Sequence, residues 1–141
     1  MAGRAAFGTT IAFGQSPTNV ANVTEISGLD GDVEMIDVTS HDSGGAYREK
    51  IASFIDAGQV SLEINFDPNN VTHRATTGGI IYLRDQRITE TWRITFPGTP
   101  THYVTFQAFV KNAGFSAPFD DKLGMSVTLE VTGPATWTYG T

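Results

Sequence analysis

VSLEINFD, residues 60–67, alternates without a break between apolar and polar side chains. Successive side chains of a β-strand point to opposite faces of the sheet, so this stretch predicts a strand with one buried and one exposed face. LGMSVTLEVT, residues 123–132, alternates in the same way and stops at Gly133-Pro134, where a turn is expected. The sequence therefore predicts a sheet built from amphipathic strands.

Composition supports the same fold class. Thr, Val and Ile occur 19, 10 and 10 times, whereas Leu occurs only 5 times, and β-branched residues fit a pleated surface better than a helix. The 141 residues are expected to form a single domain, 1–141, that can bury its own core. Cysteine is absent, which excludes disulfides, thiolate metal ligands and a cysteine nucleophile.

Several shorter stretches also predict strands, and one region predicts a helix. Asp67 is a good N-cap and Pro68 suits the first helical position, so a flanking helix is expected from here, broken near Gly78-Gly79. In the strand at 33–38, alternation fails at Met35-Ile36, which indicates a β-bulge or a change of face. The other predicted strands are Thr9–Phe13, Val20–Ile26, Trp92–Phe96, Tyr103–Val110 and Thr136–Tyr139.

One long segment, Thr39–Gly58, follows neither a helical nor a strand period. A loop of about 20 residues is uncommon inside a compact domain and usually functional or disordered. Four apolar residues in this loop have no clear place in a core: Tyr47, Ile51, Phe54 and Ile55. Exposed apolar groups on a loop indicate a surface that binds a partner.

The negative charge is concentrated in the first third of the chain. No Lys or Arg occurs from Ala5 to Tyr47, while six acids do: Glu25, Asp30, Asp32, Glu34, Asp37 and Asp42. These six equal the whole net charge of −6, because nine acids balance nine bases elsewhere. Such a surface disfavours ordinary nucleic-acid binding. Two interpretations remain open: a solvated face that aids solubility, or a surface that avoids holding a polyanion.

Catalytic and metal-binding patterns are missing from the sequence. It has no phosphate loop, no G-x-G-x-x-G and no G-x-S-x-G elbow. Its three histidines, including His41, are far apart, and Asp120-Asp121 is typical of a turn. We therefore expect no enzyme, no cofactor and no metal. No apolar run approaches the roughly 18 residues of a membrane span, so no membrane insertion is expected.

One binding function stays open at this point. Trp92, Trp137 and Tyr139 could form an aromatic platform on a monomeric β-sandwich that binds carbohydrate or protein. This alternative predicts a clustered, exposed group of aromatic rings and a stable monomer.

Three stretches of the chain resemble signatures of the tail tube (major tail) proteins of long-tailed bacteriophages. They are IDVTSHDSGG with YREKI at 36–51, DAGQVSLEINFDP at 56–68, and SVTLEVTG at 126–133. The resemblance covers roughly Gly28 to Trp137. The sequence departs from the family's pattern at Lys50–Phe54, where relatives tend to carry an apolar residue followed by Pro-Gly.

The resemblance implies a β-sandwich or barrel-like tail tube fold with one flanking helix and a long inter-strand loop. It implies a structural virion protein, self-assembled into stacked hexameric rings, whose lumen delivers DNA to the host without specific binding. The implied partners are further copies of the chain and the tail tip or initiator, tape measure and tail terminator proteins. The implied location is the virion tail, assembled in the host cytoplasm. The resemblance does not distinguish such a protein from a tube subunit of a contractile tail or secretion system.

The same resemblance gives two sets of candidate residues. In the family, Thr39–Gly58 corresponds to a loop that reaches the neighbouring ring, and the strands on either side, Val33–Val38 and Gln59–Asp67, contribute to the lumen wall. The expected lumen-lining acids are Asp32, Glu34, Asp37 and Glu63. The expected inter-ring contacts are His41, Tyr47, Arg48, Ile51, Phe54 and Ile55.

Overall fold

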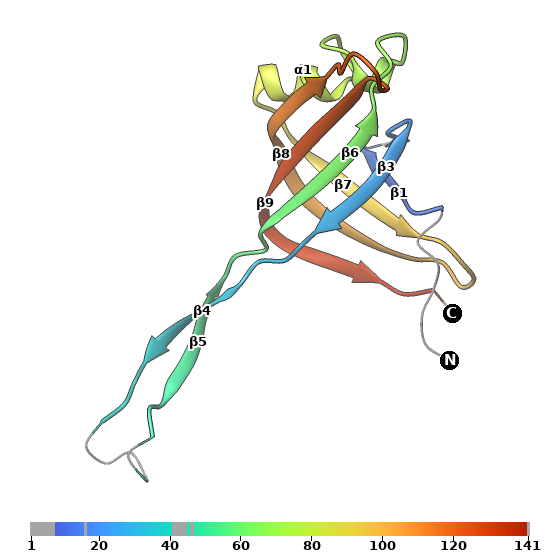
Figure 1. Cartoon of the computed structure of the whole chain (residues 1–141). Helices are drawn as coiled ribbons and strands as arrows, with labels where there is room; N and C mark the ends of the chain where they lie inside the picture. The colour runs from blue at the N-terminus through green and yellow to red at the C-terminus, as the bar shows by residue number, and fades with distance from the viewer. Residues whose placement is uncertain (1–7, 16, 41–44, 46, 141) are drawn as a thin grey trace.

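The computed structural model describes residues 8–15, 17–40, 45 and 47–140. It contains a curled seven-stranded antiparallel sheet, in the order β2-β1-β7-β8-β9-β6-β3, and a separate two-stranded hairpin, β4-β5, that projects from it (Figure 1). The strands of the sheet are β1 (Thr10–Phe13), β2 (Thr18–Asn19), β3 (Val23–Gly28), β6 (Gln59–Asn65), β7 (Thr89–Phe96), β8 (His102–Ser116) and β9 (Gly124–Thr138). The predicted fold class, mainly β and barrel-like with one helix, is confirmed.

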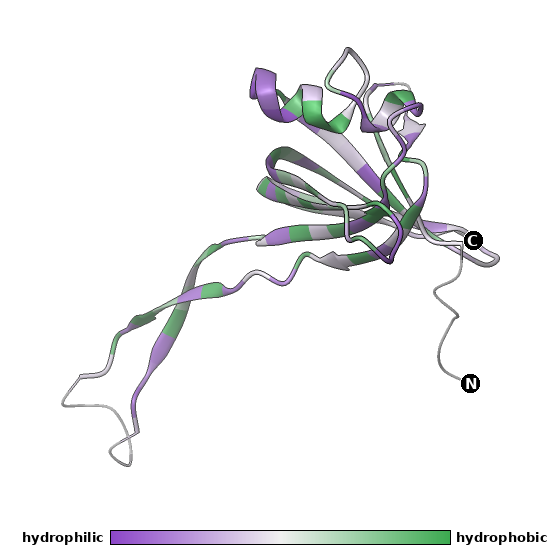
Figure 2. Ribbon diagram, turned by 45° about the horizontal axis from the view of Figure 1, so that its top comes forward, coloured by the Kyte–Doolittle hydropathy of each residue, from purple (hydrophilic) through white to green (hydrophobic). Residues whose placement is uncertain are grey.

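The alternating stretches form the sheet because their apolar side chains fill the core inside the curl. In β6, Val60, Leu62 and Ile64 are buried, while Ser61 and Glu63 between them are exposed. β9 contributes its own alternating buried set from Met125 to Val131. Figure 2 shows the resulting alternation of hydrophobic and hydrophilic residues along the strands. Removing apolar surface from water stabilises the fold by roughly 20–33 cal/mol per Å², and this is the main source of stability in such a core.

Strand β9 is longer than its alternation predicts. It continues through Gly133-Pro134 to Thr138, so the predicted turn is wrong and the predicted strand at 136–139 is the end of β9. The reason lies in the register with β8. Thr132 is paired with Gln107 and Thr136 with Thr105, so four steps along β9 match two along β8. The extra residues bulge out, and this removes the need for Pro134 to donate a ladder hydrogen bond.

The helical region also differs from its prediction. The Asp67 carboxylate accepts a hydrogen bond from Asn69 N at 3.0 Å and so forms a turn. Asn70 instead caps a 3-10 turn, η2 (Val71–His73), by accepting from Thr72 N. The helix α1 (Ile80–Gln86) begins after Gly79 rather than breaking there. A Cβ on Gly79 would overlap the backbone of Arg74, so this close approach requires glycine.

The segment predicted as a long loop contains a strand. β5 (Lys50–Ile55) pairs antiparallel with β4 (Val33–Asp37), and both project from the sheet as one hairpin, which we call the arm. The bulge predicted in β4 is confirmed, since the β4–β5 register shifts between Val33 and Met35. β4 does not pair with β6, although the two strands were expected to contribute together to the lumen wall. β3 takes that place beside β6.

Candidate assembly surfaces

The arm exposes a large apolar surface. Phe54, Tyr47 and Ile55 are 79%, 77% and 75% exposed, and Ile51 is also exposed. The exposure predicted for these four residues is confirmed, and Met35, Ile36, Val33 and Val38 add to the same surface. An apolar surface of this size on a projecting hairpin indicates a contact with another chain.

Both faces of the arm are apolar. Ile36 is paired with Ile51, whereas the neighbouring pair, Met35 and Ala52, must point to the opposite face. An ordinary amphipathic hairpin covers a core with one face, but this one covers nothing with either. The arm is therefore suited to lie between two partners. This also explains why its sequence lacks the alternation that marks the sheet strands.

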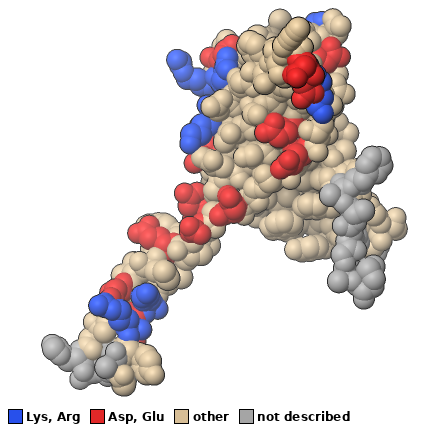
Figure 3. Space-filling view, in the orientation of Figure 1, with Lys and Arg blue, Asp and Glu red and all other residues tan. Residues whose placement is uncertain are grey.

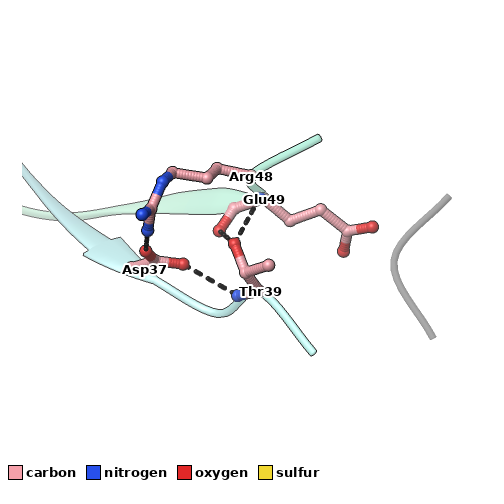
Figure 4. A network of polar contacts seen from close by, with 4 residues as sticks. All are labelled: Asp37, Thr39, Arg48 and Glu49. Carbon is pink, nitrogen blue, oxygen red and sulfur yellow. Dashed lines mark hydrogen bonds and ion pairs between the residues drawn. The ribbon is translucent and has the colours of Figure 1, made fainter. Parts of the chain in front are cut away.

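Polar contacts hold the outer half of the arm together (Figure 4). Asp37 accepts hydrogen bonds from Arg48 Nη1 and from Thr39 N, both at 2.9 Å. Glu49 N donates to Thr39 Oγ1 at 2.7 Å. The hydrogen bonds from Thr39, and secondarily Arg48, hold the pKa of Asp37 below its ordinary value. Asp37 is thus part of the hairpin rather than a free carboxylate. His41, another predicted contact, lies outside the described residues.

A depressed pKa makes these contacts sensitive to acid. The charged form of Asp37 is favoured in the folded arm, so its contribution is present above the unfolded pKa of about 3.9 and is lost as pH falls through the lower folded value. We expect the Thr39 amide signal in NMR to titrate with a midpoint below 3.9, and Asp37→Asn to abolish the titration. A midpoint at or above the unfolded value would contradict this assignment.

The arm leaves the body where two chain segments touch through their backbones. A Cβ on Gly31 would overlap the Asp56 carbonyl group, and a Cβ on Gly58 would come within 2.6 Å of Gly31 N. Gly58 also has φ +85, which L side chains rarely adopt. Asp56 N donates to Asp32 O at 2.9 Å beside this contact. The junction therefore fixes the direction of the arm.

We expect Gly31→Val to disrupt this junction while the seven-stranded sheet stays folded. The branched side chain cannot fit beside the Asp56 backbone. Protection of the Asp56 and Gly58 amides against hydrogen exchange should therefore fall by roughly ten-fold or more, which corresponds to a loss of about 1.4 kcal/mol in the free energy of local opening. Amides of β6 and β9 should keep their protection. Gly114→Val is the matched control, because the nearest atom to a Cβ added there is Asn112 Oδ1 at 3.9 Å, an ordinary van der Waals contact. Unchanged protection at Asp56 would contradict the proposed tight contact.

A second surface is the polar face of β3, β6 and β9. Glu25 of β3 is paired with Glu63 of β6, and Glu63 with Ser126 of β9, whose hydroxyl lies 3.0 Å from both carboxylate oxygens. Glu130 is paired with Gln59 on the same sheet. These three strands carry no Lys or Arg. We call Glu25, Glu63 and Glu130 the acidic face; Figure 3 shows acids over this side of the body and along the base of the arm.

Of the four acids predicted for the lumen, Glu63 lies on this sheet. Asp32, Glu34 and Asp37 lie at the base of the arm or on it, because the chain turns away from the sheet after β3. That turn follows Gly28 and passes through Leu29, which has φ +58. Glu130 was detectable from the alternation of 123–132. Glu25 was not, because a register shift between Val23 and Glu25 changes which side chains share the face.

The aromatic platform of the binding-module alternative does not form. Trp92 is fully buried in the core, and its Nε1 donates to Ala108 O at 3.1 Å. Trp137 stacks on Phe96 with ring centroids 5.9 Å apart. Trp137 and Tyr139 line an open apolar hollow of about 1100 Å³ within the curl of the sheet. Because Trp92 is on the inside, the exposed cluster of three rings that the binding-module alternative requires is not present.

Within the described ranges, no three His, Asp or Glu side chains lie close enough to hold a metal ion. None of the helices seen in that part of the chain has the length and hydropathy needed to cross a membrane.

Several solved structures share the fold of this chain. The chain is similar to a chain in the virion of a native gene transfer agent particle, with a TM-score of 0.78 and 13% identity, covering 97% of this chain and 100% of the other. It is similar to a chain in the sheath/tube terminator of an extracellular contractile injection system, with a TM-score of 0.71, 13% identity and 99% of both chains covered.

A third similar structure is that of the SPP1 tail tube, with a TM-score of 0.66, 10% identity and 94% and 77% of the two chains covered. At these identities the likeness concerns the fold alone. A search of curated protein sequences finds no match. The family assignment rests on sequence: the family model described as "Lambda phage tail tube protein, TTP" matches residues 7–138. The chain belongs to the lambda phage tail tube protein family.

Proposed function

We propose that this chain is the structural subunit of a virion tail tube, in which six copies form a ring and the rings stack into a hollow tube that delivers DNA. The observation that carries the proposal is the arm, which exposes apolar side chains on both faces and covers no part of its own body. Membership of the tail tube protein family supports it.

The edges of the sheet support side-by-side assembly. In the described part of the chain, β3 and β2 are the outer strands of the curled sheet. Open strand edges are an aggregation hazard in a free subunit, and closing a ring covers them. Neighbouring copies in the ring would therefore meet along these edges, with the arm left free to reach the next ring.

The acidic face is the part of the sheet we assign to the lumen. Cationic contacts to phosphates hold DNA with a strength that rises with their number. A wall of Glu25, Glu63 and Glu130 with hydroxyl side chains between them offers no such contact. DNA would then pass without specific binding, which accounts for an acid-rich surface without any catalytic role.

The assembly would need further proteins of the tail. A tip or initiator would start the tube, a tape measure protein would occupy it during growth, and a terminator would end it, with assembly in the host cytoplasm. The arm and the acidic face suit a tube with or without a contractile sheath. A tube subunit of a contractile tail or secretion system therefore remains the second candidate, supported by the likeness to the injection-system chain.

Negative-stain electron microscopy of the purified protein at high concentration tests the proposal. Stacked rings or hollow tubes are the expected result. Particles that stay monomeric, even after tail-initiation proteins are added, would overturn it.

A further inference from the structure

The apolar hollow inside the curl of the sheet reaches the core. It has a volume of about 1100 Å³, and its lining includes Ile94 and Val104, which belong to the buried core. The stacked rings of Phe96 and Trp137 line it as well. An open apolar hollow of this size leaves part of the core next to solvent, so a further segment is expected to cover it.

The hollow lies where the two sides of the curled sheet approach each other without pairing. Ile26 of β3 and Leu29, just after that strand, line one side of it, while Gly8 and Thr9, just before β1, line the other. β3 is one outer strand of the sheet, and β1 is the neighbour of β2, the other outer strand. The hollow is therefore the seam that the sheet leaves open when it curls.

The start of the described chain identifies a segment that can cover this seam. Gly8 is the first described residue and itself lines the hollow, so the seven residues before it, MAGRAAF, begin at the wall of the hollow. Seven extended residues span up to about 23 Å, which is more than the width of a hollow of this volume. Their one charged side chain is Arg4, whereas Ala5, Ala6 and Phe7, next to Gly8, are apolar.

This segment has an advantage over any segment of a second copy. Because it is attached at the hollow, its effective concentration there is in the millimolar range that short flexible linkers give. A separate subunit in dilute solution cannot compete with that concentration. Exposed phenylalanines of the body, Phe115 and Phe119, lie at the far end of the β8–β9 hairpin from Trp137 and cannot reach the hollow of their own subunit.

We propose that residues 1–7 fold over the hollow of their own subunit, with Phe7 packed beside the stacked rings of Phe96 and Trp137. The segment closes the seam between β3 and β1 and shields the core of the free subunit from water. This inference goes beyond the proposed function and does not depend on it, because it concerns the subunit before any ring forms.

Tryptophan fluorescence tests the cover in the free subunit. The chain has two tryptophans, and Trp92 is fully buried, so changes in solvent exposure report on Trp137 in the hollow. We expect Phe7→Ser to shift the emission to longer wavelength and to increase quenching by acrylamide, because water and quencher then enter the hollow. Phe115→Ser removes an exposed phenylalanine at the far end of β8 and is the matched control, with both readouts unchanged.

NMR on the wild-type chain identifies what covers the hollow without relying on a variant. We expect nuclear Overhauser contacts from the Phe7 ring to the Trp137 indole and to the Ile26 methyl groups. The sample is a mixture of isotope-labelled and unlabelled subunits, at a concentration where the chain is monomeric. Isotope-filtered spectra should show these contacts within one chain and none between chains.

The outcomes separate this inference from the proposed function. A wild-type chain without contacts between Phe7 and the hollow, or unchanged Trp137 fluorescence in Phe7→Ser, would overturn the cover. Contacts found only between labelled and unlabelled chains would assign the hollow to a second copy and would also overturn it. Failure to form rings or tubes would overturn the proposed function alone, because the cover is measured on the free subunit.

Discussion

Replacing Phe54 and Ile55 together by serine should leave the domain folded and stop tube growth. Both side chains are more than 70% exposed in the subunit, so their loss removes little from its core. In the proposed tube they would be buried, and burying a large apolar side chain contributes roughly 1.5–3 kcal/mol. Six arms in each proposed ring would multiply this loss at every interface between rings. Electron microscopy and sedimentation should find monomers or single rings and no long tubes.

Two controls make this result specific to the arm. Val71→Ser removes an exposed apolar side chain outside the arm and should leave tube length unchanged. Thermal unfolding of the double variant should stay within about 4 °C of the wild-type Tm, the shift that 1 kcal/mol gives in a domain of this size. Tubes of normal length from the double variant would mean that the arm does not join rings.

Reversing charge on the acidic face should slow DNA passage through an otherwise normal tube. Glu25 and Glu63 are cross-strand neighbours, so Glu25→Lys with Glu63→Lys places two cations side by side on every subunit. Each cation that reaches a phosphate strengthens binding in a salt-dependent manner. We expect DNA ejection from virions carrying both changes to slow by roughly ten-fold or more at low salt and to recover as salt is raised.

The neutral pair Glu25→Gln with Glu63→Gln separates charge reversal from simple loss of charge. It adds no cation and should change the ejection rate far less. Glu90→Lys places the same charge on β7, outside the three strands of the acidic face, and should leave the rate unchanged. A normal ejection rate from the double lysine variant, with tubes intact, would mean that the acidic face does not line the lumen.

Alternation predicted β6 and β9 because each of them buries one side. β6 and β9 have an unbroken period of two, and their apolar positions are the core of the structure. β5 could not be found in this way. All but one of its residues are exposed, so nothing constrains its two sides to differ. A strand that buries neither face in the subunit leaves no period in the sequence.

The helix shows a different limit. Asp67-Pro68 is a start signal for a helix, but the same Asp side chain can equally close a short turn, as it does here by accepting from Asn69 N. The two glycines that seemed to break the helix stand before it, where Gly79 lets the chain pass the backbone of Arg74. Whether Asp67 begins a helix or closes a short turn is decided by contacts between residues that are distant in sequence.

The candidate surfaces were predictable in part. The exposed apolar residues of the arm followed from their lack of a core position, and Glu63 from its place in β6. The position of Glu34 relative to Glu63 depended on the direction of the chain after β3, which a positive φ at Leu29 changes. Phe119 was not singled out, because an aromatic residue in a short turn gives no signal of its exposure until the turn is placed in space.

A cryo-electron microscopy reconstruction of the assembled tube tests the central claim most directly. We expect six copies per ring, with each arm lying between its own ring and the next and with Glu25, Glu63 and Glu130 facing the central channel. Arms that point outward from the tube, or an acidic face on its outer surface, would contradict this account of how the chain assembles and how DNA passes.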